Sequence, residues 1–299
     1  MSPRKYPKHK PPIPPDGGSQ LILQCLGLSM PLVINDAEHS LDVVFVSIDF
    51  EVSRYEINKP GPPLVKEFGI AVLDTRRLNV TSPLSKASST TCLETGTIIT
   101  KQFSTSHSSE DFVSCDVTDF RECIFAETFH VTQENLATTI KDCLMIQDMN
   151  FADKTVWRDV VLAGHSPKHD LQVIQRLGVD ISSLVKVIGV VDTHLIARSM
   201  VRAEVVSENA TALVVTNFTL GAILTGLAIP HNKFDLHNAA NDATLTLHAV
   251  LTFAVRSCNN QDLGNREKEN LRQLRQLIQW ELYERQHWVP KRTPLGFFA

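Results

Sequence analysis

Several features are missing from the sequence, and each absence excludes a class of protein. No hydrophobic run is long enough to cross a bilayer, which excludes a membrane-spanning protein and argues against a membrane partner. The apolar residues 21–30 follow positive charge, but a proline-rich spacer and the lack of an A-x-A site argue against a signal peptide. The six cysteines form no CxxC pair in a chain of 299 residues, which indicates reduced thiols. We therefore expect an intracellular protein of the cytoplasm, the nucleus or both.

An excess of basic charge is also missing. The formal net charge is -4, so any contact with nucleic acid has to come from a local patch. The composition is 43% hydrophobic and 21% charged, which is ordinary for a globular protein with a full core. The length would admit two domains, but one α/β domain with tails and an insertion fits the sequence equally well.

The chain divides into three predicted parts. Residues 1–39 are expected to be a disordered or extended tail, because basic residues and a proline cluster at its start cannot bury enough surface. Residues 40–258 would form the main domain, in which residues 76–122, rich in Ser and Thr, are a long insertion without periodicity. Residues 259–299 contain a charged helix with one apolar stripe. Docking of that stripe on the main domain is favoured over dimerisation or contact with nucleic acid.

The apolar, β-branched residues 43–51 predict a buried central strand. The strand ends in Asp49 and Glu51, which share a face because alternate residues of a strand point the same way. Two carboxylates at the end of a buried strand repel each other unless a cation lies between them or one of them is protonated. The strand end is therefore a candidate site for a hard metal ion, and the alternative is a strand that simply ends in solvent.

Other strands and helices are predicted from periodicity and turn residues. A strand at 67–74 would pair antiparallel with the first strand across the turn at 58–63. A crossover helix is predicted over 133–149 from its apolar spacing. The remaining strands are expected at 123–131, 160–164 and 185–191.

Acidic residues follow two of these strands. Ser166 and Pro167 predict a helix start, with Ser as the cap and Pro at the first helical position, so Asp170 falls in the first turn. An acid in a first turn is common for reasons of the helix dipole alone. Asp192 ends the next strand and is most simply the cap of the helix that follows.

A histidine and another acid lie near the start of the last helix of the domain. Asn238 is predicted to cap this helix, which places His237 on the preceding loop and Asp242 inside the helix. From these positions both side chains can reach one site. A single histidine before a helix is usually solvated or used for packing. Four acids and a histidine at separate strand ends and helix starts instead suggest a common site.

The order of these motifs resembles the DEDDh 3′-to-5′ exonucleases of the RNase H-like superfamily, over roughly residues 43–255. Ser166 and His169 stand where members of the family usually have Asn and Phe, which concerns the fit of the substrate rather than a metal ligand. The segments 67–69 and 124–127 also look like a fungal branch that includes an Argonaute-associated exonuclease. The matching motifs are Asp49-x-Glu51, Gly164-His165-Ser166-Pro167-Lys168-His169-Asp170, Asp192-Thr193 and His237-x-Ala239-x-x-Asp242.

The resemblance implies a fold and a chemistry. The fold would be an RNase H-like α/β fold, with a five-stranded mixed sheet, its first three strands antiparallel, and helices on both faces. Two divalent ions about 3.5 to 4 Å apart would clamp the phosphodiester group. Oxygen ligands alone suit Mg²⁺ or Mn²⁺ rather than zinc. The implied metal ligands are Asp49, Glu51, Asp170 and Asp242.

The resemblance also implies that His237 is the general base, since an ordinary histidine pKa of about 6.5 suits proton transfer near neutral pH. The expected activity is hydrolysis of single-stranded RNA or DNA from the 3′ end. The alternative is a catalytically weak scaffold or nucleic-acid-binding protein that acts through protein partners on its tails or insertion. The complete set of five residues favours the enzyme, because a binding protein has no need for all of them.

Overall fold

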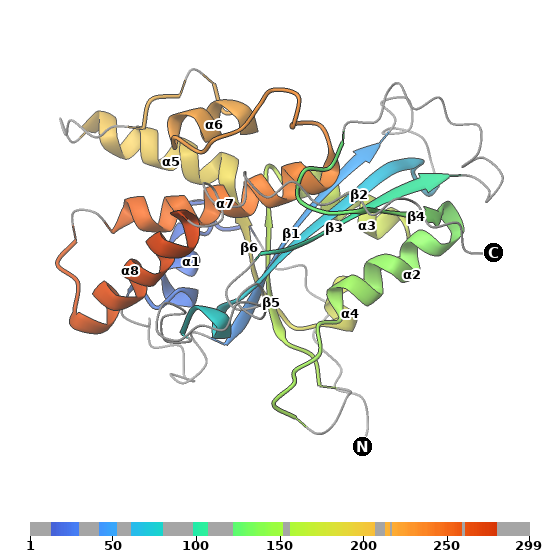
Figure 1. Ribbon diagram of the computed structural model, residues 1–299, viewed down its shortest axis with the longest axis horizontal. Coiled ribbons are helices and arrows are strands. Elements are labelled where there is room, and N and C mark those ends of the chain that lie inside the picture. The colour runs from blue at the N-terminus through green and yellow to red at the C-terminus, as the bar shows by residue number, and fades with distance from the viewer. Residues whose placement is uncertain are drawn as a thin grey trace, which may run out of the picture.

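The computed structural model describes residues 13–29, 42–52, 61–79, 98–106, 122–151, 156–206, 213–215, 217–258 and 261–279. Their strands form one six-stranded mixed sheet in the order β4-β3-β2-β1-β5-β6 (Figure 1). β1 pairs antiparallel with β2 and parallel with β5, so it lies inside the sheet. The strands are β1 Val43–Val52, β2 Val65–Asp74, β3 Ile99–Ser106, β4 Thr128–Thr132, β5 Asp159–Gly164 and β6 Val187–Asp192.

Helices cover both faces of the sheet, which divides the hydrophobic core into two layers. Residues Val43 and Phe45 of β1 pack in the core layer that includes α1 and α7, whereas Val44 and Val46 pack in the layer that includes α2, α3 and α4. β1 is apolar on both faces because both are covered. The helices are α1 Ser19–Cys25, α2 Gln133–Leu144, α3 Lys168–Arg176, α4 Ile181–Leu184, α5 Thr193–Val206, α6 Leu220–Gly226, α7 Ala239–Ser257 and α8 Asn265–Gln279, and η1 Thr75–Asn79 is a 3₁₀ helix.

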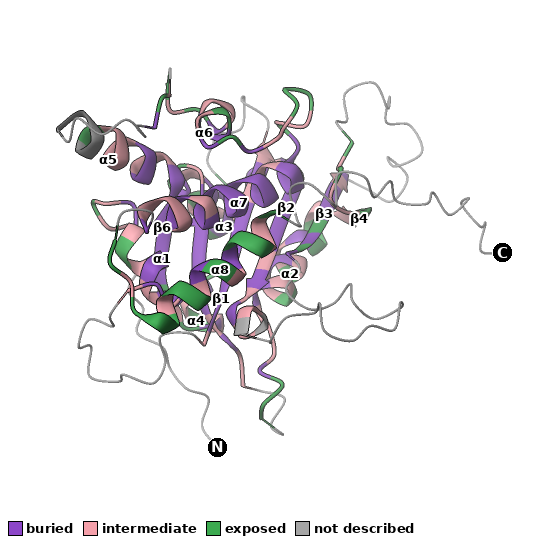
Figure 2. Ribbon diagram, turned by 60° about the vertical axis from the view of Figure 1, so that its left-hand side comes forward, coloured by how far each residue is buried: buried purple, intermediate pink, exposed green. Residues whose placement is uncertain are grey.

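The helix α7 is the main element on its face of the sheet. It packs against β1, β2, β3 and β5 and also contacts α1, α5, α6 and α8. Figure 2 shows the more exposed α8 in front of the buried strands, with the largely buried α7 next to it. None of the described helices is long and apolar enough to cross a membrane.

The expected architecture is present, but the prediction of five strands is wrong. The additional strand is β3, which lies inside residues 76–122, the stretch expected to be an insertion. β3 pairs antiparallel with β2, so the first three strands of the sheet are antiparallel, and β4 then joins β3 in parallel. β3 is difficult to recognise in the sequence because it contains several polar residues. Thr100, Gln102 and Ser104 are nevertheless buried in the structure, through tertiary hydrogen bonds or packing.

The prediction of a disordered or extended tail over residues 1–39 is wrong for residues 13–29. Ile22 and Leu28 are buried in the core layer that includes α7. The carbonyl of Gly17 accepts a hydrogen bond from the backbone N–H of Asp192, at 2.9 Å. The segment cannot order itself, but it is ordered by docking on the domain. Residues 1–12 and 30–39 lie outside the described residues.

The C-terminal helix α8 docks through its apolar stripe, since Leu271 and Leu274 are buried in the core layer with α7. The helix also contacts η1. Residues 280–299 lie outside the described residues. The division of the chain into residues 1–39, 40–258 and 259–299 therefore stays a prediction.

Ion pairs join the chain at the end of the sheet where β1 begins and β2 ends. Arg158 donates to both carboxylate oxygens of Asp74 at 3.0 Å, and its side chain is 2% exposed. Arg76 donates to both oxygens of Asp148, at 2.6 and 2.8 Å. Asp42 contacts both arginines. Each of the three acids at this end of the sheet thus pairs with at least one of the two arginines.

Candidate active site

Asp49 and Glu51 lie at the other end of β1, where the strand begins to emerge from the core. Both side chains are half-buried, whereas Phe50 between them is buried on the opposite face. The Phe50 ring stacks on Phe68 of β2, with ring centroids 4.9 Å apart. This packing holds the register of the strand end, so the two carboxylates project together toward α7.

Asp170 reaches the same strand end from the first turn of α3. Its side chain is only 6% exposed, and its Oδ1 accepts a hydrogen bond from the backbone N–H of Phe50 at 3.2 Å. The bond joins the start of α3 to the backbone between Asp49 and Glu51. Asp170 lies in the first turn of the helix, as predicted.

His237 and Asp242 come from the start of α7. Asn238 caps the helix by accepting a hydrogen bond from the N–H of Asn241, as predicted. The backbone N–H of His237 donates to Oδ2 of Asp242 at 3.1 Å, and the His237 side chain is exposed. His237 has φ of 63°, in the left-handed region where residues other than glycine are uncommon. This turn brings the loop back over the helix that it precedes.

The five residues singled out in the sequence meet at one place. Glu51, His237 and Asp242 each offer one ligand atom, and these atoms lie within 4.8 Å of one another. Asp49 is close enough to Asp170, Asp242 and Glu51 for their charges to raise its pKa. The site is therefore assembled from β1, α3 and the start of α7.

The electrostatics of the site are those of crowded acids. Burial, followed by the charges of Asp170, Asp242, Glu51 and Glu67, raises the pKa of Asp49 well above its usual value. Burial also raises the pKa of Asp170 to about 7, against the opposing hydrogen bonds from the backbone N–H groups of Asp170 and Phe50, and the charge of Glu51 adds a smaller upward contribution. Protonation is one way to relieve such repulsion, and a bound cation is the other.

The donor set fits a divalent cation. Carboxylate oxygens are the preferred ligands of hard cations such as Mg²⁺ and Mn²⁺, and several of them converge here on adjoining elements. Glu51 and Asp242 are half-buried, so a cation would remain accessible to a substrate phosphate. Because Asp49 and Asp170 are costly to ionise together, a cation between the acids would stabilise the ionised form.

The loop between β5 and α3 differs from the predicted helix cap. The helix begins at Lys168, Pro167 is its N-cap residue, and no side chain caps it, so the prediction of Ser166 as the cap is wrong. Ser166 instead has φ of 58°, and its N–H donates to Oδ1 of Asp192 at 3.0 Å. The same Oδ1 accepts from the N–H of His194 at 2.9 Å. Asp192 therefore caps α5, as predicted, and also holds the loop that leads to Asp170.

His165 belongs to this loop and is not among the five site residues. Its Nδ1 lies 3.0 Å from the hydroxyl of Thr193, and its ring stacks edge-on against His194. Burial, and then the neighbouring His194, lower the pKa of His165 to about 4. The ring is thus neutral at neutral pH, which suits a role in holding the loop.

Two buried polar residues near the site were not singled out in the sequence. Glu67 of β2 and Gln102 of β3 hydrogen-bond to the start of α7. The only local feature that could have indicated Glu67 and Gln102 is the presence of a polar residue within a strand of the sheet. That signal is weak for Gln102, because its strand lies in a stretch that has few apolar residues.

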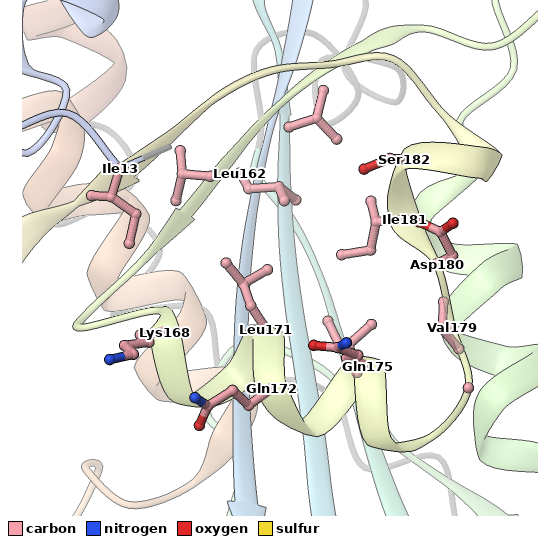
Figure 3. A pocket seen from close by; sticks show the side chains of 14 residues that line it. Ile13, Leu162, Lys168, Leu171, Gln172, Gln175, Val179, Asp180, Ile181 and Ser182 are labelled. Atoms are coloured by element: carbon pink, nitrogen blue, oxygen red, sulfur yellow. The ribbon is translucent and has the colours of Figure 1, made fainter. Parts of the chain in front are cut away.

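A cavity of about 650 Å³ lies elsewhere, on the face of the sheet next to α3 and α4. Leu171 and Ile181 line it from α3 and α4, together with Leu162 of β5 (Figure 3). None of the five site residues lines this cavity. Its lining is mainly apolar, so it lacks the convergent carboxylates that distinguish the end of β1.

The mixed sheet, the helices on both faces and the acidic site at the end of β1 define an α/β protein with the RNase H-like exonuclease fold. Residues 44–253 match the family model described as DNA polymerase III subunit epsilon-like, C-terminal domain, or DEDDh_C. The chain therefore belongs to the DEDDh exonuclease family, which implies a hydrolase that acts on nucleic acid with divalent metal ions. No curated protein matches the chain.

Proposed function

We propose that this protein is a 3′-to-5′ exonuclease that hydrolyses phosphodiester bonds of single-stranded RNA or DNA with two Mg²⁺ or Mn²⁺ ions. The observation that carries the proposal is the convergence of four carboxylates and one histidine from β1, α3 and α7 at one accessible place. Membership of the DEDDh family supports the same chemistry. The direction of digestion and the strandedness of the substrate are part of the proposal.

Each of the five residues has a proposed role. Asp49, Glu51, Asp170 and Asp242 would hold the ions, which when bound supply positive charge to the phosphate group during displacement. His237 would accept the proton of the attacking water, because its exposed side chain lies beside Glu51 and Asp242. The His237 backbone donates to Asp242, so the base and one ligand are held in a fixed relation.

Packing supports the roles by limiting movement of the acids. The hydrogen bond from Phe50 to Asp170 and the stacking of Phe50 on Phe68 restrain the end of β1. A site held by rigid elements loses less free energy to rearrangement during the reaction. The bond from Ser166 to Asp192 restrains the loop before α3 in the same way.

We further propose that the protein belongs to the fungal branch that includes an Argonaute-associated exonuclease, and that it acts inside the cell with a protein partner. The similarity at residues 67–69 and 124–127 supports this assignment. In the structure both segments contact the start of α7, since the N–H of Ile124 donates to Asn241 and Glu67 accepts from Ala239.

The function is tested with single-stranded RNA and DNA oligonucleotides labelled at the 5′ or the 3′ end. With Mg²⁺ or Mn²⁺, the 5′-labelled strand should shorten stepwise and the 3′ label should be released first as a mononucleotide. EDTA should stop the reaction, and a 3′-phosphate should slow it. Release of the 5′ label first would contradict the direction. Oligonucleotide binding without any cleavage would support the alternative of a catalytically weak binding protein.

A further inference from the structure

Two polar side chains from the sheet are buried beneath the start of α7. Glu67 is 6% exposed and Gln102 is 1% exposed. They lie on the neighbouring strands β2 and β3, where Gln102 pairs with Gly69. A carboxylate at this depth costs free energy unless several donors reach it, so its hydrogen bonds indicate what holds it there.

The Oε2 atom of Glu67 accepts three hydrogen bonds. The donors are Nε2 of Gln102 at 3.0 Å, Nδ2 of Asn238 at 3.2 Å and the backbone N–H of Ala239 at 3.1 Å. Gln102 continues the network, because its Oε1 accepts from the backbone N–H of Ala240 at 2.8 Å. Both sheet residues thus bond directly to the first turn of α7.

These bonds satisfy the groups that a helix start leaves open. The first N–H groups of a helix have no partner within the helix. In α7, Glu67 accepts from Ala239, Gln102 accepts from Ala240, and the cap residue Asn238 accepts from Asn241 at 3.1 Å. Two of these three partners belong to the sheet, so the helix start is held by long-range contacts as well as by its own cap.

Gly69 allows the helix to approach closely enough for these bonds. A Cβ atom at Gly69 would lie 2.1 Å from the carbonyl carbon of Ala239 and 2.2 Å from the nitrogen of Ala240. Both of these are backbone atoms, which a side-chain movement cannot clear. The start of α7 therefore rests directly on β2, between the side chains of Glu67 and Gln102.

The held residues lie between two members of the proposed active site. His237 precedes the capped turn and Asp242 follows it, and the backbone of His237 donates to Asp242 across the turn. Asn241 also ties the turn to the preceding loop, because its Nδ2 donates to the carbonyl of Asp235 at 2.9 Å. A shift of the turn would move the base and the ligand together.

We propose that Glu67, supported by Gln102, is a positioning residue that holds His237 and Asp242 in the geometry needed for metal binding and catalysis. The inference rests on the proposed exonuclease function. The rival role for Glu67 is that of a fifth metal ligand, since it lies close enough to Asp49 to raise that pKa. Three donors to one oxygen favour positioning, because that oxygen is engaged with protein groups.

The test compares Glu67→Ala and Glu67→Gln with a matched control, Thr100→Val. Thr100 also joins β3 to α7 by a buried hydrogen bond, to Thr244 at 2.9 Å, but it contacts the helix beyond its first turn. Glu67→Gln keeps an oxygen that can accept from Ala239 while it removes the charge. The three proteins and the parent are compared only when circular dichroism shows them to be folded.

Glu67→Ala should lower turnover and Mn²⁺ affinity by roughly 10- to 100-fold, the usual effect of removing a group that orients a metal ligand. The KM for an oligonucleotide should change much less than kcat. Hydrogen exchange of the amides in residues 238–241 should accelerate. Thr100→Val should leave turnover, Mn²⁺ affinity and exchange of these amides within about twofold of the parent. Glu67→Gln should restore most of the loss.

Outcomes of three kinds overturn the proposal. Equal losses of Mn²⁺ affinity in Glu67→Gln and Glu67→Ala, with parent-like exchange, would make Glu67 a metal ligand. Parent-like affinity and exchange in Glu67→Ala would remove any special role. Equal effects in Thr100→Val would reduce the role to general stability. Hydrogen exchange and Mn²⁺ affinity are measured without cleavage. A parent protein that degrades no oligonucleotide would therefore refute the proposed function, while these two measurements still decide the positioning role.

Discussion

The pKa values of buried acids shift in opposite directions at the two ends of the sheet. Asp148, at the end where β1 begins, is 5% exposed, and Asp170, at the end where β1 finishes, is 6% exposed. The hydrogen bonds from Arg76 lower the pKa of Asp148. Burial among other acids raises the pKa of Asp170 to about 7. Both side chains are almost inaccessible to solvent, but their pKa values shift in opposite directions, because Asp148 has an arginine partner whereas Asp170 lies deeper in the protein and has none among the described residues.

The opposite pKa shifts distinguish acids that stabilise the fold from acids whose repulsion a bound cation would relieve. At the first end, arginines supply the positive charge, so the protein itself completes the network. At the second end, acids from three elements face one another, which costs stability until a cation binds. Natural proteins accept such local cost at functional sites.

Asp49→Asn should have the largest effect on activity and should not weaken the fold. The change keeps the shape of the side chain but removes one charge from the cluster that is proposed to hold the ions. Turnover should fall by orders of magnitude, while the melting temperature in EDTA should stay the same or rise as repulsion is relieved. Asp148→Asn, at the other end, should lower the melting temperature and keep turnover per folded molecule. Cleavage by Asp49→Asn at the parent rate would exclude Asp49 as a ligand.

His237→Ala should separate chemistry from binding. No proposed metal ligand is lost, so affinity for metal and oligonucleotide should persist, while turnover falls by roughly 10²- to 10⁴-fold, the usual worth of a positioned base. The exposed side chain predicts little change in stability. Turnover and substrate affinity are measured on protein whose circular dichroism matches the parent. Unchanged turnover would show that His237 serves only the turn before α7.

Arg158→Met should affect only the end of the sheet where acids are paired. It leaves Asp74 and Asp42 without this arginine, at a cost of about 2 to 4 kcal/mol, below that of a fully buried pair because both acids are partly exposed. Lys186→Met breaks the exposed pair with Asp159 and should cost less than about 1 kcal/mol. Urea unfolding measures both changes. Turnover per folded molecule should match the parent, and a loss of turnover would show that the two ends are coupled.

The two ends should also respond differently to pH when metal is removed. The pKa of Asp170 rises from 3.8 to about 7 on folding, so between these values the folded protein holds a proton that the unfolded chain releases. The free energy of unfolding should therefore fall between about pH 4 and pH 7, by on the order of 2 kcal/mol. Asp148 has a lowered pKa, so its contribution is present above about pH 4 and is lost on acidification.

Urea unfolding in EDTA over this pH range tests the prediction with Asp170→Asn and Asp148→Asn. Asp170→Asn should reduce the decline between pH 4 and 7, to which the raised pKa of Asp49 also contributes, and Asp148→Asn should lose part of the decline below pH 4. Added Mn²⁺ should flatten the first decline in the parent, because the ion favours ionised carboxylates. A parent protein whose stability is flat from pH 4 to 7 in EDTA would contradict the raised pKa of Asp170.

Signals that are local in the chain were enough to predict much of the site. The apolar run of β1 and its alternation place Asp49 and Glu51 on one face. A helix start after β5 places Asp170 in a first turn, and Asn238 caps α7 as a local side-chain hydrogen bond. Each of these features depends on residues within a few positions of one another. These features can therefore be predicted from the sequence.

Features that depend on distant residues were missed or wrongly assigned. β3 contains polar residues whose partners lie on other elements, such as Gln102 with Ala240, so its pattern does not resemble a strand. The segment 13–29 is ordered by a core that other residues supply. Ser166 bonds to Asp192 rather than capping its own helix. In each case a long-range contact outweighed the local preference.

The amino-acid sequence, through its motifs and their resemblance to the DEDDh exonucleases, predicts which acids and which histidine come together. The sequence does not specify how close they come, or which charges are neutralised. Those properties arise when β1, α3 and α7 pack, because desolvation and repulsion act between residues that are far apart along the chain. The same packing places Glu67 against the start of α7, where the energy of a buried carboxylate depends wholly on donors from other elements.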